Sequence, residues 1–192
     1  MFEAKKFDHL LGTEGFSDGL LNNHFTLYEG YVKNTNLLKG RLEELRAKGK
    51  VASPEFAEMK RRFGWEWNGM RLHELYFGNL TKEAAWLDDE DTLRERITMS
   101  FGDFEAWEKD FRATGAMRGI GWTVLVLDTV TGELSNIWVS EHDGGHLAGA
   151  KPLLVMDVFE HAFVLDYGLK RAEYVDSFFR HIDWNVVTKR MA

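Results

Sequence analysis

Two long stretches of this chain carry apolar residues at helical spacing, and only a short turn separates them. Between residues 18 and 47, apolar side chains return every three or four positions with charges between them. A second stretch runs from Ser53 to Leu80 and begins with a Ser-Pro pair, which is typical of a helix start. Residues 47–50 form the turn between them. We therefore expect the chain to begin with an antiparallel helical hairpin.

The acidic run at residues 88–91 interrupts the helical pattern of apolar residues, and we place a domain boundary there. The elements expected beyond it are helices over 91–99 and 103–117, strands over 121–128, 134–139 and 153–156, and a further helix over about 161–179. These patterns predict an α+β fold with two domains. Residues 1–87 would form the helical hairpin, and residues 88–192 an α/β domain with a small, mainly antiparallel three-stranded sheet.

Composition excludes several classes of function. The chain has 31 Asp and Glu against 24 Lys and Arg, a net charge of -7, so we expect no nucleic-acid partner. Its apolar runs are far too short to cross a membrane, and we expect a cytoplasmic protein. Cysteine is absent, so any metal must be held by His, Asp or Glu.

Two of the seven histidines lie on the apolar stripes of the expected hairpin. His24 and His73 belong to different helices, and inward histidines on facing helices can meet. Burying an imidazole costs free energy unless its nitrogens are paired, and a shared metal ion would satisfy both rings at once. Two separate core histidines bonded to backbone carbonyls explain these two residues equally well.

A carboxylate and a third histidine favour the metal. Asp157 comes directly after an expected buried strand, where an unpartnered charge is costly, and His161 follows four residues later. Three imidazoles and one carboxylate offer nitrogen and oxygen donors without sulfur. That set suits iron or manganese, and zinc less distinctively. We expect one metal site at the interface of the two domains.

The sequence around these residues resembles the iron/manganese superoxide dismutases. Residues 157–162 read DVFEHA, similar to the family signature D-x-W-E-H-A, and Arg171 and Tyr174 follow in its R-x-x-Y pattern. Residues 24–34 are similar to the helix that carries the family's first ligand, residues 67–77 to the helix that carries the second, and Gly121-Trp122 to the G-W before its sheet. The resemblance covers nearly the whole chain.

This resemblance implies an activity and a ligand set. His24, His73, Asp157 and His161 would bind one iron or manganese ion per chain, with a solvent molecule as fifth ligand. The enzyme would convert superoxide into oxygen and hydrogen peroxide, an antioxidant reaction. Tyr31 would match the family's active-site gate tyrosine.

The resemblance also implies roles around the metal and between chains. Glu160 would match the glutamate that bridges to a ligand histidine of the other subunit, in a homodimer or tetramer. Tyr28 stands at a helix position that pairs across the dimer in the family, so we expect Glu160 and Tyr28 at the interface. Trp122 and Phe159 would wall the cavity.

Departures from the family pattern are informative. The glutamine that tunes the bound solvent in most members is absent, because Gly69 occupies one of its positions. We assign its role to His142, in the loop before the third strand. Phe159 replaces a tryptophan. Tyr28 and Val164 replace the histidine and tyrosine of a proton-relaying bridge between subunits, which we expect to be lost.

The spacing between His24 and Tyr31 is seven, one less than is usual in the family. On a regular helix, positions 24, 28 and 31 fall within about 60° of one another. We therefore expect a plain α-helix here, without a π-bulge.

Two alternatives to an active dismutase remain open at this stage. A catalytically weak or inactive metal-binding relative with an interaction or structural role would keep the ligands and lose the bridge. A mononuclear iron oxygenase is more remote, because its site uses two histidines and one carboxylate and leaves three positions open.

Overall fold

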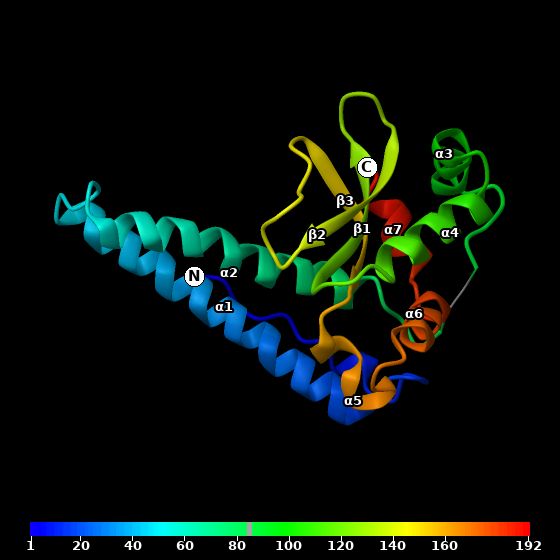
Figure 1. The fold of residues 1–192 in the computed structure, drawn as a ribbon, viewed down its shortest axis with the longest axis horizontal. Coiled ribbons are helices and arrows are strands. Elements are labelled where there is room, and N and C mark those ends of the chain that lie inside the picture. Colours follow the sequence, from blue (N-terminus) through cyan, green and yellow to red (C-terminus); the bar gives the residue numbers. More distant parts are fainter. Residues whose placement is uncertain (84–85) are drawn as a thin grey trace.

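A computed structural model describes residues 1–83 and 86–192 (Figure 1). Its elements are η1 (Asp8–Leu10), α1 (Asp18–Ala47), α2 (Pro54–Gly78), α3 (Thr92–Phe101), α4 (Phe104–Gly115), β1 (Gly121–Asp128), β2 (Leu134–Ser140), β3 (Ala150–Asp157), η2 (Glu160–Ala162), α5 (Val164–Tyr167), α6 (Arg171–Arg180) and α7 (Trp184–Lys189). The predicted α+β fold is confirmed. The division into two domains at residue 87 stays a prediction.

The helical hairpin is the longest feature of the molecule. Helices α1 and α2 run side by side and extend well beyond the sheet, to the left in Figure 1. Ser17 and Ser53 cap them, each accepting a hydrogen bond from a backbone N–H three residues on. α1 is α-helical from Asp18 to Ala47, so the expectation of a helix without a π-bulge is confirmed. α2 ends at Gly78, two residues earlier than expected.

The sheet is small and fully antiparallel, with the order β2-β1-β3. α4 packs against β1 and β2, while α2 contacts β3. β3 begins at Ala150, so Pro152 lies inside the strand and not before it as expected. The proline is tolerated because β3 is an edge strand and its register with β1 shifts at this point. The register places Trp122 opposite Asp157.

The expectation of a single helix over about residues 161–179 is wrong. The chain instead forms the 3-10 turn η2, the short helix α5 and the separate helix α6, followed by α7. Phe159 has extended backbone before η2, and Gly168 ends α5 with a φ of 56°, a conformation that stops a helix. His161 therefore projects from a tight turn.

Buried aromatic side chains join the hairpin to the rest of the molecule. Fully buried rings come from α2, α4 and α6, among them Tyr76, Phe77, Trp107, Phe111 and Phe178. All belong to one continuous apolar core. Among the described residues, no helix is both long enough and apolar enough to cross a membrane.

Candidate metal centre

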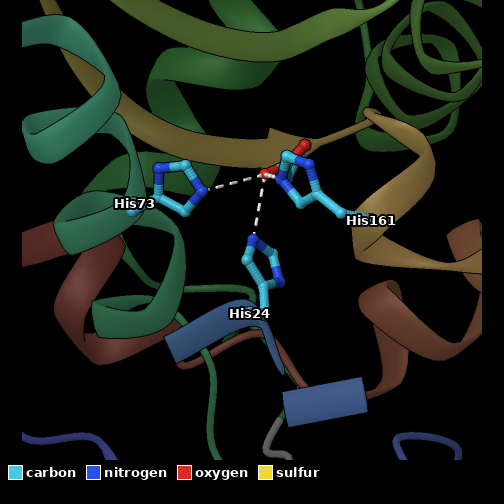
Figure 2. Close-up of side chains that lie close together, drawn as sticks. His24, His73 and His161 are labelled. Atoms are coloured by element: carbon cyan, nitrogen blue, oxygen red, sulfur yellow. Dashed lines mark hydrogen bonds and ion pairs between the residues drawn. The ribbon is translucent and has the colours of Figure 1, made fainter. Parts of the chain in front are cut away.

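The four predicted ligand residues converge on one point between the hairpin and the sheet. Figure 2 shows the three histidines, whose rings point toward this place. One atom from each of His24, His73, Asp157 and His161 lies within 4.8 Å of the others. Asp157 Oδ2 is the centre of the group, with Nε2 of His24 and of His161 both at 3.1 Å and Nε2 of His73 at 3.6 Å. All four side chains are buried except that of His161, which is 23% exposed.

The helices and the end of β3 set the orientation of the side chains that could bind a metal. Regular α-helices carry His24 and His73 on their buried stripes. The Nδ1–H of His73 donates to the Gly69 carbonyl one turn earlier on α2, at 2.6 Å, which directs Nε2 into the centre. Asp157 ends β3, and its Oδ1 accepts from the Phe159 N–H at 2.9 Å. The hydroxyl of Tyr174 donates to the Asp157 carbonyl at 2.6 Å, so the strand end is anchored from α6.

Electrostatics favour a charged aspartate beside neutral rings at His24 and His73. Burial lowers the pKa of His24, and it lowers the pKa of His73 well below its ordinary value. Burial alone would raise the pKa of Asp157, but His161 and His24 outweigh it and hold that pKa below its usual range. Burial lowers the pKa of His161, but the charge and hydrogen bond of Asp157 together with the charge of Glu160 outweigh burial, so the net shift is upward.

An unpartnered nitrogen shows that these residues fit a metal ion. Nε2 of His73 is buried and has no hydrogen-bond partner within the described part of the chain, although it points at the other donors. Because Nδ1 carries the ring proton, Nε2 presents a lone pair. A cation would satisfy it together with the carboxylate and the other two imidazoles. Iron and manganese both accept this donor set.

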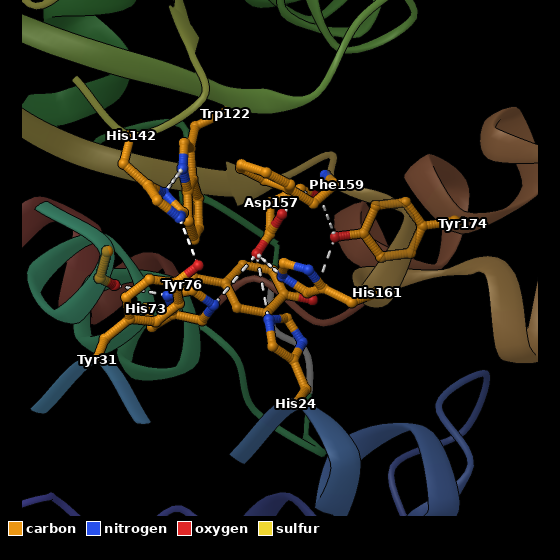
Figure 3. Close-up of polar contacts among 11 residues, drawn as sticks. His24, Tyr31, His73, Tyr76, Trp122, His142, Asp157, Phe159, His161 and Tyr174 are labelled. Carbon is orange, nitrogen blue, oxygen red and sulfur yellow. Dashed lines mark hydrogen bonds and ion pairs between the residues drawn. The ribbon is translucent and has the colours of Figure 1, made fainter. Parts of the chain in front are cut away.

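A chain of hydrogen bonds flanks the donors on one side (Figure 3). Trp122 Nε1–H donates to His142 Nδ1 at 3.1 Å, and His142 Nε2 lies 2.7 Å from the Tyr31 hydroxyl. An indole N–H can only donate, so the neutral imidazole carries its proton on Nε2 and donates it to Tyr31. Burial lowers the pKa of His142 to about 4, which keeps the ring neutral.

A tight turn brings His142 inward. Backbone hydrogen bonds in both directions between Ser140 and Gly144 close the turn, and Glu141 adopts a φ of 51° within it. His142 is thereby fully buried, whereas His146 in the same loop stays exposed. Tyr31 and His142, both predicted from the sequence, therefore lie in contact beside the donors.

The predicted cavity walls also lie against the site. The Trp122 ring packs edge-on to His73, with centroids 4.9 Å apart. Phe159 stacks between His142 and His161, at 4.8 and 5.1 Å. On the other side Gly69 leaves room for Tyr31: a Cβ at this glycine would lie 2.5 Å from the tyrosine ring.

The outward side of the site contains one predicted interface residue but not the other. Glu160 is exposed next to His161. Tyr28, however, is only 1% exposed, and its hydroxyl accepts from the Lys5 N–H at 2.9 Å and donates to Glu74 at 3.2 Å. It has no surface to offer a second chain, so its expected place in an interface is wrong. The N-terminal segment covers it.

Sequence reasoning missed Trp65, which packs against His142, and the charged pair of Arg62 and Glu66 beside it. The Trp65 ring packs edge-on against His142, with centroids 4.8 Å apart. Arg62 lies over Trp65 and pairs with Glu66, a buried carboxylate. The spacing 62, 66, 69, 73 places Arg62 and Glu66 on the same stripe of α2 as Gly69 and His73, and this periodicity was the signal that could have found them.

A helical hairpin and a small antiparallel sheet that bring three histidines and an aspartate to one point define a protein with a single buried metal centre. The family model described as "Iron/manganese superoxide dismutases, C-terminal domain" matches residues 89–190. The chain therefore belongs to the iron/manganese superoxide dismutase family.

Curated relatives cover nearly the whole chain. "Superoxide dismutase [Mn] 2" of Haloferax volcanii is 37% identical over 163 residues, which are 85% of this chain and 80% of the relative. "Superoxide dismutase [Fe]" of Aquifex pyrophilus is 35% identical over 95% of this chain and 88% of the relative. The protein of the same name from Cupriavidus metallidurans is 36% identical over 93% of this chain and 89% of the relative. Both iron and manganese proteins are thus among the relatives.

Proposed function

We propose that this chain is a superoxide dismutase, which converts two superoxide anions and two protons into one molecule of oxygen and one of hydrogen peroxide. The convergence of three imidazoles and one carboxylate on a single buried point is the observation that carries the proposal. His24, His73, Asp157 and His161 would hold one iron or manganese ion. The ion would supply the redox chemistry, taking an electron from one superoxide and returning it to another.

The protein's own part is to deliver protons and to shape the site. Burial raises the pKa of Tyr31 to about 12, so its hydroxyl stays protonated at neutral pH. The Tyr31 oxygen accepts from His142, and the hydroxyl proton is not used in that bond. This proton can therefore be offered to the peroxide product. Trp122 holds His142 in the tautomer that this arrangement needs.

We propose a homodimer in which a second copy covers the exposed side of the centre. His161 and Glu160 line a surface pocket of about 360 Å³ together with Leu20, Asn23, Val164 and Leu165. Val164 and Leu165, neighbours in this pocket, are 41% and 60% exposed, so they offer an apolar surface that a second copy could cover. By the family resemblance, Glu160 would reach His161 of the second copy. A tetramer would need a further contact, and the projecting hairpin is a surface that could supply it.

Reconstitution with each metal tests the activity. Purified protein is loaded with iron or with manganese, and superoxide consumption is followed by stopped-flow absorbance, with Asp157→Asn as the inactive control. We expect activity with at least one metal. Full metal occupancy without activity for either ion would overturn the proposal and favour the inactive metal-binding relative. The antioxidant role and the cytoplasmic location stay predictions.

A further inference from the structure

Arg62 and Glu66 form a charged pair on the face of α2 that also carries Gly69 and His73. Arg62 Nε donates to Glu66 Oε1 at 2.7 Å, and a second guanidinium nitrogen lies 2.6 Å from the same oxygen. The second carboxylate oxygen accepts from Asn34 Nδ2 at 3.3 Å. The pair is asymmetric: the side chain of Arg62 is 56% exposed and that of Glu66 only 3%. Arg62, the positive partner, is therefore the one exposed to solvent.

Packing connects this pair to the catalytic side of the site. The Arg62 guanidinium lies 5.0 Å from the centre of the Trp65 ring, and Trp65 packs against His142. Asn34, which holds Glu66, lies one helical turn after Tyr31 on α1. Contacts through Trp65 and through Asn34 thus lead from the charged pair to His142 and Tyr31.

The charges of the pair act on Tyr31 in opposite directions. Burial is the main cause of the raised pKa of Tyr31, Glu66 adds to the rise, and Arg62 opposes it. Arg62 also lowers the pKa of His142, after the larger effect of burial. The chain as a whole carries a net charge of -7, which repels an anion. An exposed cation that packs on Trp65, next to His142, is therefore of consequence for an anionic substrate.

We propose that Arg62 is a substrate-guiding residue, the exposed cation that draws superoxide or another small monovalent anion toward Tyr31, while Glu66 fixes its position and weakens its field. The inference rests on the proposed function of the same site. Glu66 shields the guanidinium charge incompletely because the carboxylate is buried behind it. Arg62 and Glu66 should therefore have opposite effects on anion capture.

The first experiment compares two arginines on the same helix turn. Arg62→Gln and Arg61→Gln remove the same charge, but Arg61 is 74% exposed and pairs with Glu58 at 3.3 Å. We expect Arg62→Gln to lower the second-order rate of superoxide consumption by about 3- to 10-fold at low ionic strength, and Arg61→Gln to lower it by less than about 1.5-fold. At about 1 M salt, where the Debye length is about 3 Å, the difference should close. Arg62→Lys should recover part of the rate.

The second experiment tests whether removing the negative charge of Glu66 has the opposite effect on the rate. Glu66→Gln keeps the shape of the side chain and removes its charge, so we expect it to raise the rate about 2-fold at low salt. The double variant Arg62→Gln with Glu66→Gln should lie between the two single variants. Circular dichroism confirms folding for each. If Glu66→Gln does not fold, the comparison of Arg62→Gln, Arg62→Lys and Arg61→Gln decides alone.

Azide binding to the iron(III) protein, followed by its absorbance, separates this inference from the proposed function. Azide is a small anion whose affinity requires capture but not turnover, and Arg62→Gln should weaken it about 3-fold or more at low salt. If the wild type binds azide with this dependence but consumes no superoxide, the proposed function fails and the guiding role stands. Equal effects of Arg62→Gln and Arg61→Gln, or an effect of Arg62→Gln that salt does not reduce, would overturn the guiding role.

Discussion

The two sides of the metal centre are built differently. On the inner side, Trp122, His142 and Tyr31 form a hydrogen-bonded chain whose members all come from the same polypeptide. On the outer side, the His161 ring is 23% exposed, and its neighbours Glu160 and Leu165 face solvent. The inner contacts are made within one chain, whereas the outer side leaves the ring of His161, a predicted ligand, partly uncovered.

This contrast indicates where the chain can change without loss of function. Inner residues depend on one another at distances below 3.2 Å, so a substitution there disturbs its neighbours. The environment of the outer side depends on the second copy that we propose covers it. Val164, which replaces a tyrosine of the expected bridge, is exposed on the outer side, and the four donors still converge. Four substitutions test this view, in order of decreasing expected effect.

Asp157→Asn should have the largest effect because the carboxylate lies between the two sides. Nε2 of both His24 and His161 lies 3.1 Å from the oxygen that this change affects. We expect the affinity for iron or manganese to fall by more than about 100-fold, since even the loss of an outer partner of a ligand costs about 10- to 100-fold. Elemental analysis after reconstitution measures it. Full occupancy in the variant would show that the carboxylate is not a ligand.

Gly69→Ala tests how tightly the inner side is packed. The new methyl group would lie 2.5 Å from the Tyr31 ring, so the ring must move and its bond to His142 must lengthen. We expect a loss of about 1–3 kcal/mol in the free energy of unfolding, partly offset by the better helix propensity of alanine, about 1 kcal/mol. Urea unfolding of the metal-free protein measures it, with Gly64→Ala as the control, because nothing lies within 4 Å of a Cβ there. Equal effects would contradict the close packing.

Leu165→Glu tests whether a second copy covers the outer side. A charge at this exposed position would have to be buried in the dimer, so we expect dimerisation to weaken by about 10-fold or more, or about 1.4 kcal/mol. Sedimentation velocity over a range of protein concentrations measures it. Leu37→Glu, at a leucine that is also exposed but lies on the hairpin, is the matched control. An unchanged dimer in Leu165→Glu would place the interface elsewhere.

At neutral pH, His142→Gln should have the smallest effect of the four substitutions, and it should mainly change how stability depends on pH. Burial lowers the pKa of His142 from 6.5 to about 4, so between these values the unfolded chain binds a proton that the folded chain does not. The stability contributed by the neutral ring is therefore present above pH 6.5 and is lost as the pH falls toward 4. Glutamine does not titrate. Unfolding of the metal-free variant should lose less stability than the wild type between about pH 7.5 and about pH 4.5.

Local pattern was enough to predict much of the fold. The helical period of residues 18–47 and the cap at Ser53 predicted α1 and the start of α2, because periodicity and capping act within a few residues. His24, His73, Asp157 and His161 were found because metal-binding residue types are few in a chain without cysteine, and because the motif at 157–162 resembles a known family.

Tertiary packing decided the rest. His142 and Tyr31 are 111 positions apart, and a turn whose shape depends on Glu141 and Gly144 brings them together. The burial of Tyr28 depends on the N-terminal segment that bonds to it, and the single helix expected after β3 is interrupted at Gly168. Residue type and spacing determine which helix face is apolar, whereas the neighbour that each polar atom finds depends on how distant segments pack.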